Sequence, residues 1–240
     1  MKSDGFRYDR QRLIEILQRD ALKLGTFKLA SGRMSHYYVD GRRITLSSEG
    51  AALVAAGVLE QLAARNDVKA IGGLTLGADP IVGATLALAA LGGRNDLQGF
   101  LVRKEAKTHG TGKLVEGPLV PGSTVAIVDD VATTGGSSLQ AVSAVEALGC
   151  KVAVVIAVLD RLEGAAEAFS ACGLPFSPLL TIRDLGVEPL KPQPCRIAHC
   201  HGDEPPSRPE APVCNQGQRS PRSVGRGISH RCSRCGGAAH

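Results

Sequence analysis

The sequence has few aromatic side chains and no long apolar run. Phe, Tyr and Trp make up 3% of its 240 residues, and Trp is absent. The most apolar stretch, residues 80–91, is interrupted by Gly83 and is shorter than the roughly 20 residues that a membrane-spanning helix needs. The first ten residues include five charged side chains with no apolar run behind them, which disfavours a signal or transit peptide. We therefore expect a soluble, cytoplasmic protein.

Net charge is absent from the first 190 residues and concentrated in the last fifty. Residues 1–190 hold 20 Lys and Arg and 20 Asp and Glu, whereas residues 191–240 hold 8 and 3, which accounts for the net charge of +5. The last fifty residues also contain seven of the thirteen Pro, no aromatic residue, no Leu or Met and only four Ile or Val. Such a segment cannot bury enough apolar area to offset the entropy lost on ordering. We expect one folded domain over residues 1–190 and a disordered basic tail over residues 191–240.

The tail is rich in cysteine, histidine and arginine, which leaves three interpretations. Cys232 and Cys235 have the spacing of half a zinc site, but Cys195, Cys200 and Cys214 form no second close pair. The arginines could bind RNA weakly through its phosphates. Because the composition changes abruptly after the run VEPL, the sequence favours an unstructured extension, such as one produced by an altered reading frame.

The spacing of apolar residues predicts an α/β fold for the domain. A first helix is expected over residues 9–24, with Asp9 as N-cap and Gly25 as its stop, and a second from Ser47 or Ser48 to residue 65. Short apolar runs then alternate with helical ones, which predicts a parallel central sheet flanked by helices, with the ligand at the carboxyl ends of the strands. The expected strands are residues 69–74, 98–103, 124–129, 151–159 and 178–182, and the expected helices are residues 79–91, 136–148 and 163–172.

The most informative run is VAIVDDVATTGGS, from residue 125 to residue 137. An apolar strand ends there in Asp129 and Asp130, and a turn of small residues leads into a helix. The amides of residues 132–137 and the helix N-terminus suit a phosphate, to which the hydroxyls of this turn add donors. The two carboxylates would repel a phosphate, so they suit ribose hydroxyls or a metal ion. The alternative is that the aspartates cap the helix and the glycines only make a turn.

This run resembles the signature of the type I phosphoribosyltransferases, which bind phosphoribosyl diphosphate (PRPP) through this loop. The resemblance implies the type I fold, with a small N-terminal hood over the site. It also implies that PRPP is bound by Asp129, Asp130, Val131, Ala132, Thr133, Thr134, Gly135, Gly136 and Ser137.

A second run, RKEAKTHGTGKLVEG from residue 103 to residue 117, is basic and contains internal glycines. Its cations suit a pyrophosphate and its glycines suit a loop that moves, although a solvated surface loop has the same composition. The part RKEAKTHG resembles the lid of orotate phosphoribosyltransferases, which reaches across a homodimer into the neighbouring site. The resemblance assigns PRPP contacts to four residues, with Lys107 acting in trans: Arg103, Lys104, Lys107 and His109.

A third run, FKLASGRMSHYYVDGR over residues 27–42, could be a hairpin with Tyr37 and Tyr38 packed on the core. It also resembles the segment with which orotate phosphoribosyltransferases cover the base, which implies that Tyr38 and Val39 meet orotate. The lysine that precedes Ser-Gly in that family is replaced here by Ala30, so a PRPP contact at this position is not carried over.

Two shorter matches extend the resemblance. Asp160-Arg161 falls where that family's arginine pairs with the orotate carboxylate, a bidentate task suited to a guanidinium; a surface salt bridge is the alternative. The run GGLTLGADPI, residues 72–81, resembles the second glycine-rich loop, which touches pyrophosphate. Leu76 and Gly77 replace a Tyr-Lys pair often found there, so only backbone contacts are implied. The orotate set is then Tyr38, Val39, Thr133 and Arg161.

Together these matches imply a Mg²⁺-dependent transfer of the 5-phosphoribosyl group from PRPP to orotate in pyrimidine (UMP) biosynthesis. Lys107, Asp129 and Asp130 are the expected catalytic residues, the reaction is a direct displacement, and no side chain is assigned as a metal ligand. A transferase for another base is an alternative that the runs at residues 27–42 and 103–117 argue against. A PRPP-binding regulator is the other, but it would not need the lid cations and would need a basic folded surface.

Overall fold

The computed structural model describes residues 7–28, 32–105 and 113–190. The predictions made for Ala30, Lys107, His109 and the tail lie outside the described residues. The boundary proposed at residue 190 therefore stays a prediction. In the part of the chain that is described, no helix is both long enough and apolar enough to cross a membrane. The cytoplasmic location also stays a prediction.

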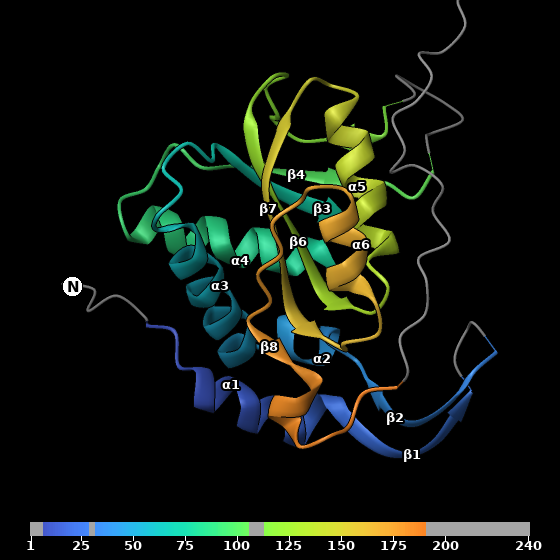
Figure 1. Cartoon of the computed structure of the whole chain (residues 1–240). Helices are drawn as coiled ribbons and strands as arrows, with labels where there is room; N and C mark the ends of the chain where they lie inside the picture. The colour runs from blue at the N-terminus through green and yellow to red at the C-terminus, as the bar shows by residue number, and fades with distance from the viewer. Residues whose placement is uncertain (1–6, 29–31, 106–112, 191–240) are drawn as a thin grey trace, which may run out of the picture. The chain divides into compact units, whose positions relative to one another are not determined.

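A six-stranded sheet in the order β5-β4-β3-β6-β7-β8 forms the centre of the described structure (Figure 1). All neighbouring strands are parallel except β4 and β5, which are antiparallel. The strand β5 was not predicted, because its two residues carry no periodic signal. The strands are β3 Ala70–Leu74, β4 Gln98–Val102, β5 Val115–Glu116, β6 Thr124–Ala132, β7 Lys151–Asp160 and β8 Leu180–Thr181.

Helices cover both faces of the sheet, which confirms the predicted fold class. On β6, Ala126 and Val128 join one apolar cluster while Val125 and Ile127 join the other, as expected for a strand buried on both faces. Residues of α3 and α4 belong to the first cluster, and residues of α5 and α6 to the second. These helices are α3 Ser48–Leu62, α4 Ala78–Leu91, α5 Gly136–Glu146 and α6 Ala165–Ala171.

The N-terminal segment differs in part from its prediction. Asp9 is the N-cap of α1, Arg10–Ile16, as expected, and a π-helical turn, Leu17–Ala21, continues it. The chain then turns into strand β1, Leu22–Lys28, so the prediction of a helix to residue 24 with Gly25 as its stop was wrong. Pairing with β2, Met34–Val39, satisfies the backbone of β1 and outweighs the helical spacing of its residues. We call this β1–β2 hairpin the hood.

Two short helical segments complete the described structure. The helix α2, Arg42–Thr45, follows the hood, and a 3₁₀ turn, Ile182–Leu185, follows β8. The second helix predicted from Ser47 or Ser48 is confirmed as α3, where the Ser47 side chain accepts a hydrogen bond from the amide of Gly50. The strands β3, β4, β6 and β7 were all predicted to within three residues. Their carboxyl ends are where the chemically informative runs meet.

Candidate active site

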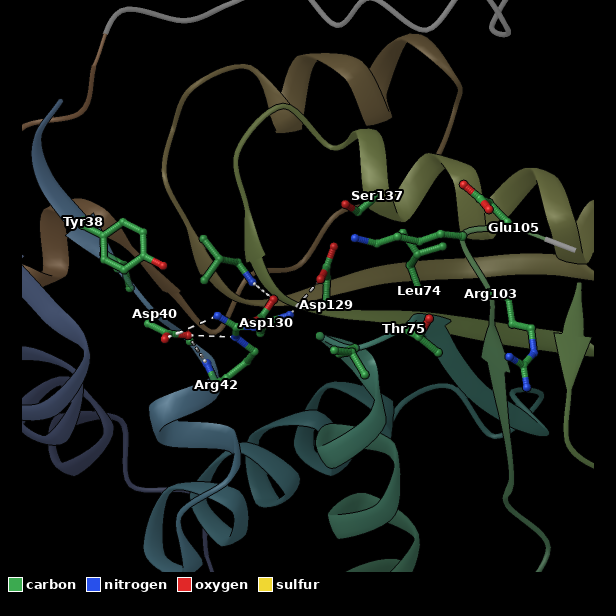
Figure 2. A pocket seen from close by; sticks show the side chains of 16 residues that line it. Tyr38, Asp40, Arg42, Leu74, Thr75, Arg103, Glu105, Asp129, Asp130 and Ser137 are labelled. Carbon is green, nitrogen blue, oxygen red and sulfur yellow. Dashed lines mark hydrogen bonds and ion pairs between the residues drawn. The ribbon is translucent and has the colours of Figure 1, made fainter. Parts of the chain in front are cut away.

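A cleft of about 700 Å³ opens at the carboxyl ends of the central strands. Figure 2 shows Tyr38 and Arg103 at opposite ends of this cleft, with Asp129 and Asp130 between them. Four segments that are far apart in the sequence therefore line the same cleft. Its lining residues are Tyr38, Val39, Asp40, Gly41, Arg42, Leu74, Thr75, Leu76, Gly77, Arg103, Lys104, Glu105, Asp129, Asp130, Val131 and Ser137.

A smaller pocket of about 240 Å³ adjoins the cleft and is lined by Asp129, Val131 and residues 132–137. It lies where β6 turns into α5, so the free amides at the start of α5 are close to it. Gly135 turns the chain with φ of +80°, and a Cβ there would lie 3.0 Å from the ring of Phe169. Both facts favour glycine at this position. This phosphate cradle, residues 132–137, has the size and the donors for one phosphate group.

Asp129 and Asp130 lie between the cradle and the open cleft, and their environments differ. Asp129 is 7% exposed, and it accepts hydrogen bonds from the Ser138 hydroxyl at 2.9 Å and the Asp130 amide at 3.0 Å. Burial raises the pKa of Asp129, and the neighbouring Asp130 carboxylate raises it further. Asp130 is less buried and accepts from the Val131 amide at 2.9 Å. The pair therefore carries concentrated negative charge that a cationic ligand or a set of hydroxyls would stabilise.

Two glycines hold the chain close around Asp130. A Cβ on Gly77 would lie 2.7 Å from the Asp130 carboxylate, and a Cβ on Gly41 would lie 3.0 Å from it. A side chain at either position would require the Asp130 side chain to move. The carboxylate is thus enclosed by backbone from the loop after β3 and from the segment after β2.

The hood supplies the end of the cleft opposite Arg103. The strand pairing expected within residues 27–42 is confirmed for β1 and β2, but the packing of both tyrosines on the core is confirmed only for Tyr37, because successive side chains of β2 point to opposite sides. Tyr37 is fully buried in the core, whereas Tyr38 is 36% exposed and lines the cleft with Val39. The Tyr38 ring lies 5.8 Å from that of Phe27 on the paired strand.

Asp40 and Arg42 line the cleft, although neither was predicted as a site residue. Nε of Arg42 donates to Oδ1 of Asp40 at 3.0 Å, and Figure 2 shows this pair beside Asp130. Both residues belong to the run that resembles the base-covering segment, so extending the prediction along that run would have found them.

The first lid residues also line the cleft. Nε of Arg103 donates to Oε1 of Glu116 at 3.0 Å, and Gln140 of α5 donates to the carbonyl of Lys104 at 2.9 Å. The start of the lid is therefore bound to the helix that begins at the phosphate cradle. The second glycine-rich loop also lines this cleft, through Leu74, Thr75, Leu76 and Gly77.

Comparisons with known proteins agree with this geometry. No protein-family model matches the chain. An orotate phosphoribosyltransferase from Rhodopirellula baltica is 47% identical over 194 residues, which cover 79% of this chain and 100% of the relative. The chain belongs to the orotate phosphoribosyltransferase family.

Two solved structures of the orotate phosphoribosyltransferase from Mycobacterium tuberculosis H37Rv match the chain. The complex with Fe(III) dicitrate has a TM-score of 0.65 at 43% identity, covering 74% of this chain and 99% of that one. The complex with PRPP has a TM-score of 0.62 at 40% identity, with the same coverage of both chains. The resemblance drawn from the sequence and the type I fold are thereby confirmed.

The described residues that were predicted by resemblance to the orotate phosphoribosyltransferases line the smaller pocket, line the large cleft, or lie outside both. Thr133 and Thr134 line the smaller pocket with the cradle, whereas Arg103 and Lys104 line the large cleft. Arg161 is not among the described residues that line either pocket. It is 7% exposed, and Nη2 lies 2.8 Å from Glu163, which is itself buried. The salt bridge considered as its alternative is present, but it is buried rather than on the surface, and the contact of Arg161 with orotate stays a prediction.

Proposed function

We propose that this protein transfers the 5-phosphoribosyl group of PRPP to orotate, giving orotidine 5′-phosphate and pyrophosphate, in pyrimidine biosynthesis. One observation carries the proposal: the phosphate cradle, the Asp129–Asp130 pair, the base-covering segment and the start of the lid border one another at the same sheet edge. A phosphorylated sugar requires this arrangement if its leaving group is bound on one side and the incoming base on the other.

The cradle is proposed to hold the 5-phosphate of PRPP. The amides of residues 132–137 and the N-terminus of α5 supply donors and partial positive charge. The hydroxyls of Thr133, Thr134 and Ser137 add further donors. Because the cradle is built on the end of a buried strand, it fixes the sugar relative to Asp129 and Asp130.

The two aspartates are proposed to bind the ribose hydroxyls and to stabilise the reaction. As pyrophosphate leaves, positive charge develops on the ribose, and the nearby carboxylates stabilise that charge. Arg103 and Lys104 are proposed to bind the pyrophosphate oxygens, where negative charge develops. Lys107 and His109 are assigned the same task from the family resemblance alone. The base then displaces pyrophosphate directly, and closure of the lid excludes water.

The residues of the cleft fit a magnesium ion that arrives with the substrate. Mg²⁺ prefers oxygen ligands and is commonly held by one or two carboxylates together with phosphates. Asp129 and Asp130 offer the carboxylates, and the described residues contain no group of three or more His, Cys, Asp or Glu that could hold a metal alone. When bound, the ion supplies charge neutralisation to the diphosphate.

Orotate is proposed to lie against the hood, between Tyr38 and the ribose. Tyr38 and Val39 line that end of the cleft. Thr133 at the cradle and Arg161 at the end of β7 complete the base-binding set by family resemblance. A homodimer, in which the lid of one protomer reaches the partner's site, and a cytoplasmic location belong to the same proposal.

The first experiment is a mixing assay that follows the ultraviolet absorbance of orotate. The protein with PRPP and Mg²⁺ should consume orotate, and EDTA should prevent the loss. Uracil, which lacks the carboxylate, should be converted far more slowly. If PRPP binds but orotate is not consumed, the protein is instead a transferase for another base or a PRPP-binding regulator.

A further inference from the structure

A buried carboxylate behind the cleft has no part in the chemistry proposed above. Glu163 is 1% exposed and lies just beyond the end of β7. Its Oε1 accepts a hydrogen bond from the Tyr37 hydroxyl at 2.9 Å and lies 2.8 Å from Nη2 of Arg161. Nη1 of Arg33 lies 3.5 Å from Oε2. We call Arg33, Tyr37, Arg161 and Glu163 the hood clamp.

The members of the clamp also contact one another directly. Nε of Arg161 donates to the Tyr37 hydroxyl at 3.3 Å, and the guanidinium lies 4.8 Å from the centre of the Tyr37 ring. Burial raises the pKa of Tyr37 to about 12, so its hydroxyl stays protonated at neutral pH and donates to Glu163. The Glu163 carboxylate therefore lies beside the guanidinium groups of Arg33 and Arg161 and accepts a hydrogen bond from the Tyr37 hydroxyl.

The clamp joins two segments that no strand pairing joins. In the described part of the chain, β1 and β2 form a two-stranded sheet of their own, separate from the central sheet. A hairpin of this size is only marginally stable by itself, so its position depends on packing and on side-chain contacts. The Tyr37–Glu163 hydrogen bond spans 126 positions of sequence and connects β2 to the end of β7.

Burying an ion pair costs desolvation free energy that apolar side chains do not incur. Apolar side chains of similar volume often stabilise a fold at least as well, so the distinctive contribution of such a pair is a fixed geometry. Here the buried contacts fix β2 relative to the end of β7, near the end of the cleft where the base is proposed to bind. Tyr38, the neighbour of Tyr37, lines the cleft, and Arg161 directly follows β7, the strand next to β6.

We propose that Glu163 is a positioning residue for the base: it holds β2 against the end of β7 and thereby sets where Tyr38 and Arg161 meet the acceptor. The inference rests on the proposed function, because it assumes that the base lies at the hood end of the cleft. It adds a residue that contacts no substrate but determines how well the base is held.

The test compares KM for orotate with KM for PRPP in two variants. Glu163→Gln keeps the side-chain volume and one acceptor oxygen but removes the charge and replaces the other oxygen by an amide donor, and Tyr37→Phe removes only the hydroxyl. The expected result is a rise in the orotate KM of about tenfold for Glu163→Gln and about fivefold for Tyr37→Phe, the scale of effect that misplacing a binding group produces. The PRPP KM should change by less than about twofold, since the cradle is built on β6 and α5.

Tyr8→Phe is the matched control for the loss of a tyrosine hydroxyl. The Tyr8 hydroxyl donates to the carbonyl of Leu179 at 3.4 Å, and burial raises its pKa to about 12 as well. Tyr8 does not line the cleft, so Tyr8→Phe should leave both KM values unchanged. Thermal melts of all three variants give the folded fraction, and Tyr37→Phe carries the test if Glu163→Gln does not fold.

Three outcomes would overturn the proposal. Folded variants with an unchanged orotate KM would show that the clamp does not position the base. An equal rise in both KM values, or a loss of kcat alone, would show general loosening or partial unfolding. If the wild-type protein does not convert orotate at all, the proposed function fails and this inference fails with it, whereas the first two outcomes leave the proposed function intact.

Discussion

The two ends of the cleft are constructed differently. The end proposed to hold the phosphate, here called the phosphate end, comes from a single run, residues 129–137, which leaves a buried strand and enters a helix. The end proposed to hold the base, here called the base end, is lined by Tyr38 on β2 and Arg42 after it, and Arg161 after β7 is proposed to join them. One end is therefore fixed by local chain geometry, and the other depends on contacts between distant segments.

This difference predicts how each end responds to mutation. Changes in residues 129–137 should act on PRPP and be hard to compensate, because the backbone itself forms the binding surface. Changes in the hood should act on orotate and be graded, because side chains there can adjust. Three mutations separate the two ends and a fourth, at Asp184, lies at neither end and tests stability alone; they follow from the largest expected effect to the smallest.

Asp129→Asn should lower kcat/KM by about 100-fold or more, because it removes one of the two charges that face the ribose. The same change should stabilise the protein without substrate at pH 8, raising Tm by about 2–4 °C. Burial and Asp130 raise the pKa of Asp129 above its unfolded value, so the folded state resists its ionisation. The charged form therefore costs stability as the pH rises above about 4, and the gain should vanish as the pH falls towards 4.

Steady-state kinetics and thermal melts at pH 4 and pH 8 check both parts of this prediction. A variant that loses activity but melts lower than wild type at pH 8 would contradict the electrostatic account of Asp129.

Gly135→Val should raise the KM for PRPP about tenfold or more and destabilise the protein by about 2–3 kcal/mol, because φ of +80° and the Phe169 ring both exclude a side chain. Gly93→Val is the matched control, since Gly93 has φ of +85° with open space around it and lies away from the cleft. It should lose stability but keep its PRPP KM. Equal PRPP KM values in the two variants would contradict a cradle at Gly135.

Tyr38→Ala should raise the KM for orotate about tenfold and leave the PRPP KM and the stability nearly unchanged, because the side chain faces the cleft and is partly exposed. Leu24→Ala, on the paired strand of the hood and 71% exposed, is the control and should leave both KM values unchanged. A shift confined to PRPP in Tyr38→Ala would reverse the assignment of the two ends.

Asp184→Asn should have the smallest effect, on stability alone, and with the opposite pH dependence to Asp129→Asn. Burial alone would raise the pKa of Asp184, but the amide and hydroxyl of Thr181 and the Arg10 guanidinium together hold it below its ordinary value. Its charged form thus stabilises the fold above about pH 4, and that contribution is lost as the pH falls through the lowered pKa. The variant should melt below wild type at pH 7, and the gap should narrow below pH 4. A gap that widens in acid would contradict this.

The phosphate end could be predicted from the sequence because its determinants are contiguous. The apolar run before Asp129 predicts a buried strand, and the small residues after Asp130 predict a turn into a helix. Both were found within a few residues of their predicted bounds. The local signals and the tertiary structure agree there, since a strand buried on both faces has few alternative conformations.

The base end was predicted less completely because tertiary pairing decides it. Leu24 lies at a helical spacing from Leu17 and Ala21, yet pairing with β2 makes it part of a strand. The burial of Arg161 depends on Glu163 and on Tyr37, which is more than a hundred residues away in sequence. No local pattern could indicate that contact, whereas Arg42 lies in the run 27–42 and could have been found by extending the prediction along it.

The close packing around Asp130 limits how this enzyme could be redesigned. Because Gly41 and Gly77 both lie against the Asp130 side chain, a larger residue at either position would displace that carboxylate. Selection for a different acceptor base in the laboratory would therefore find few useful single mutations there. The productive positions for a specificity library are Tyr38, Val39 and Arg42, which line the end of the cleft where the base is proposed to bind.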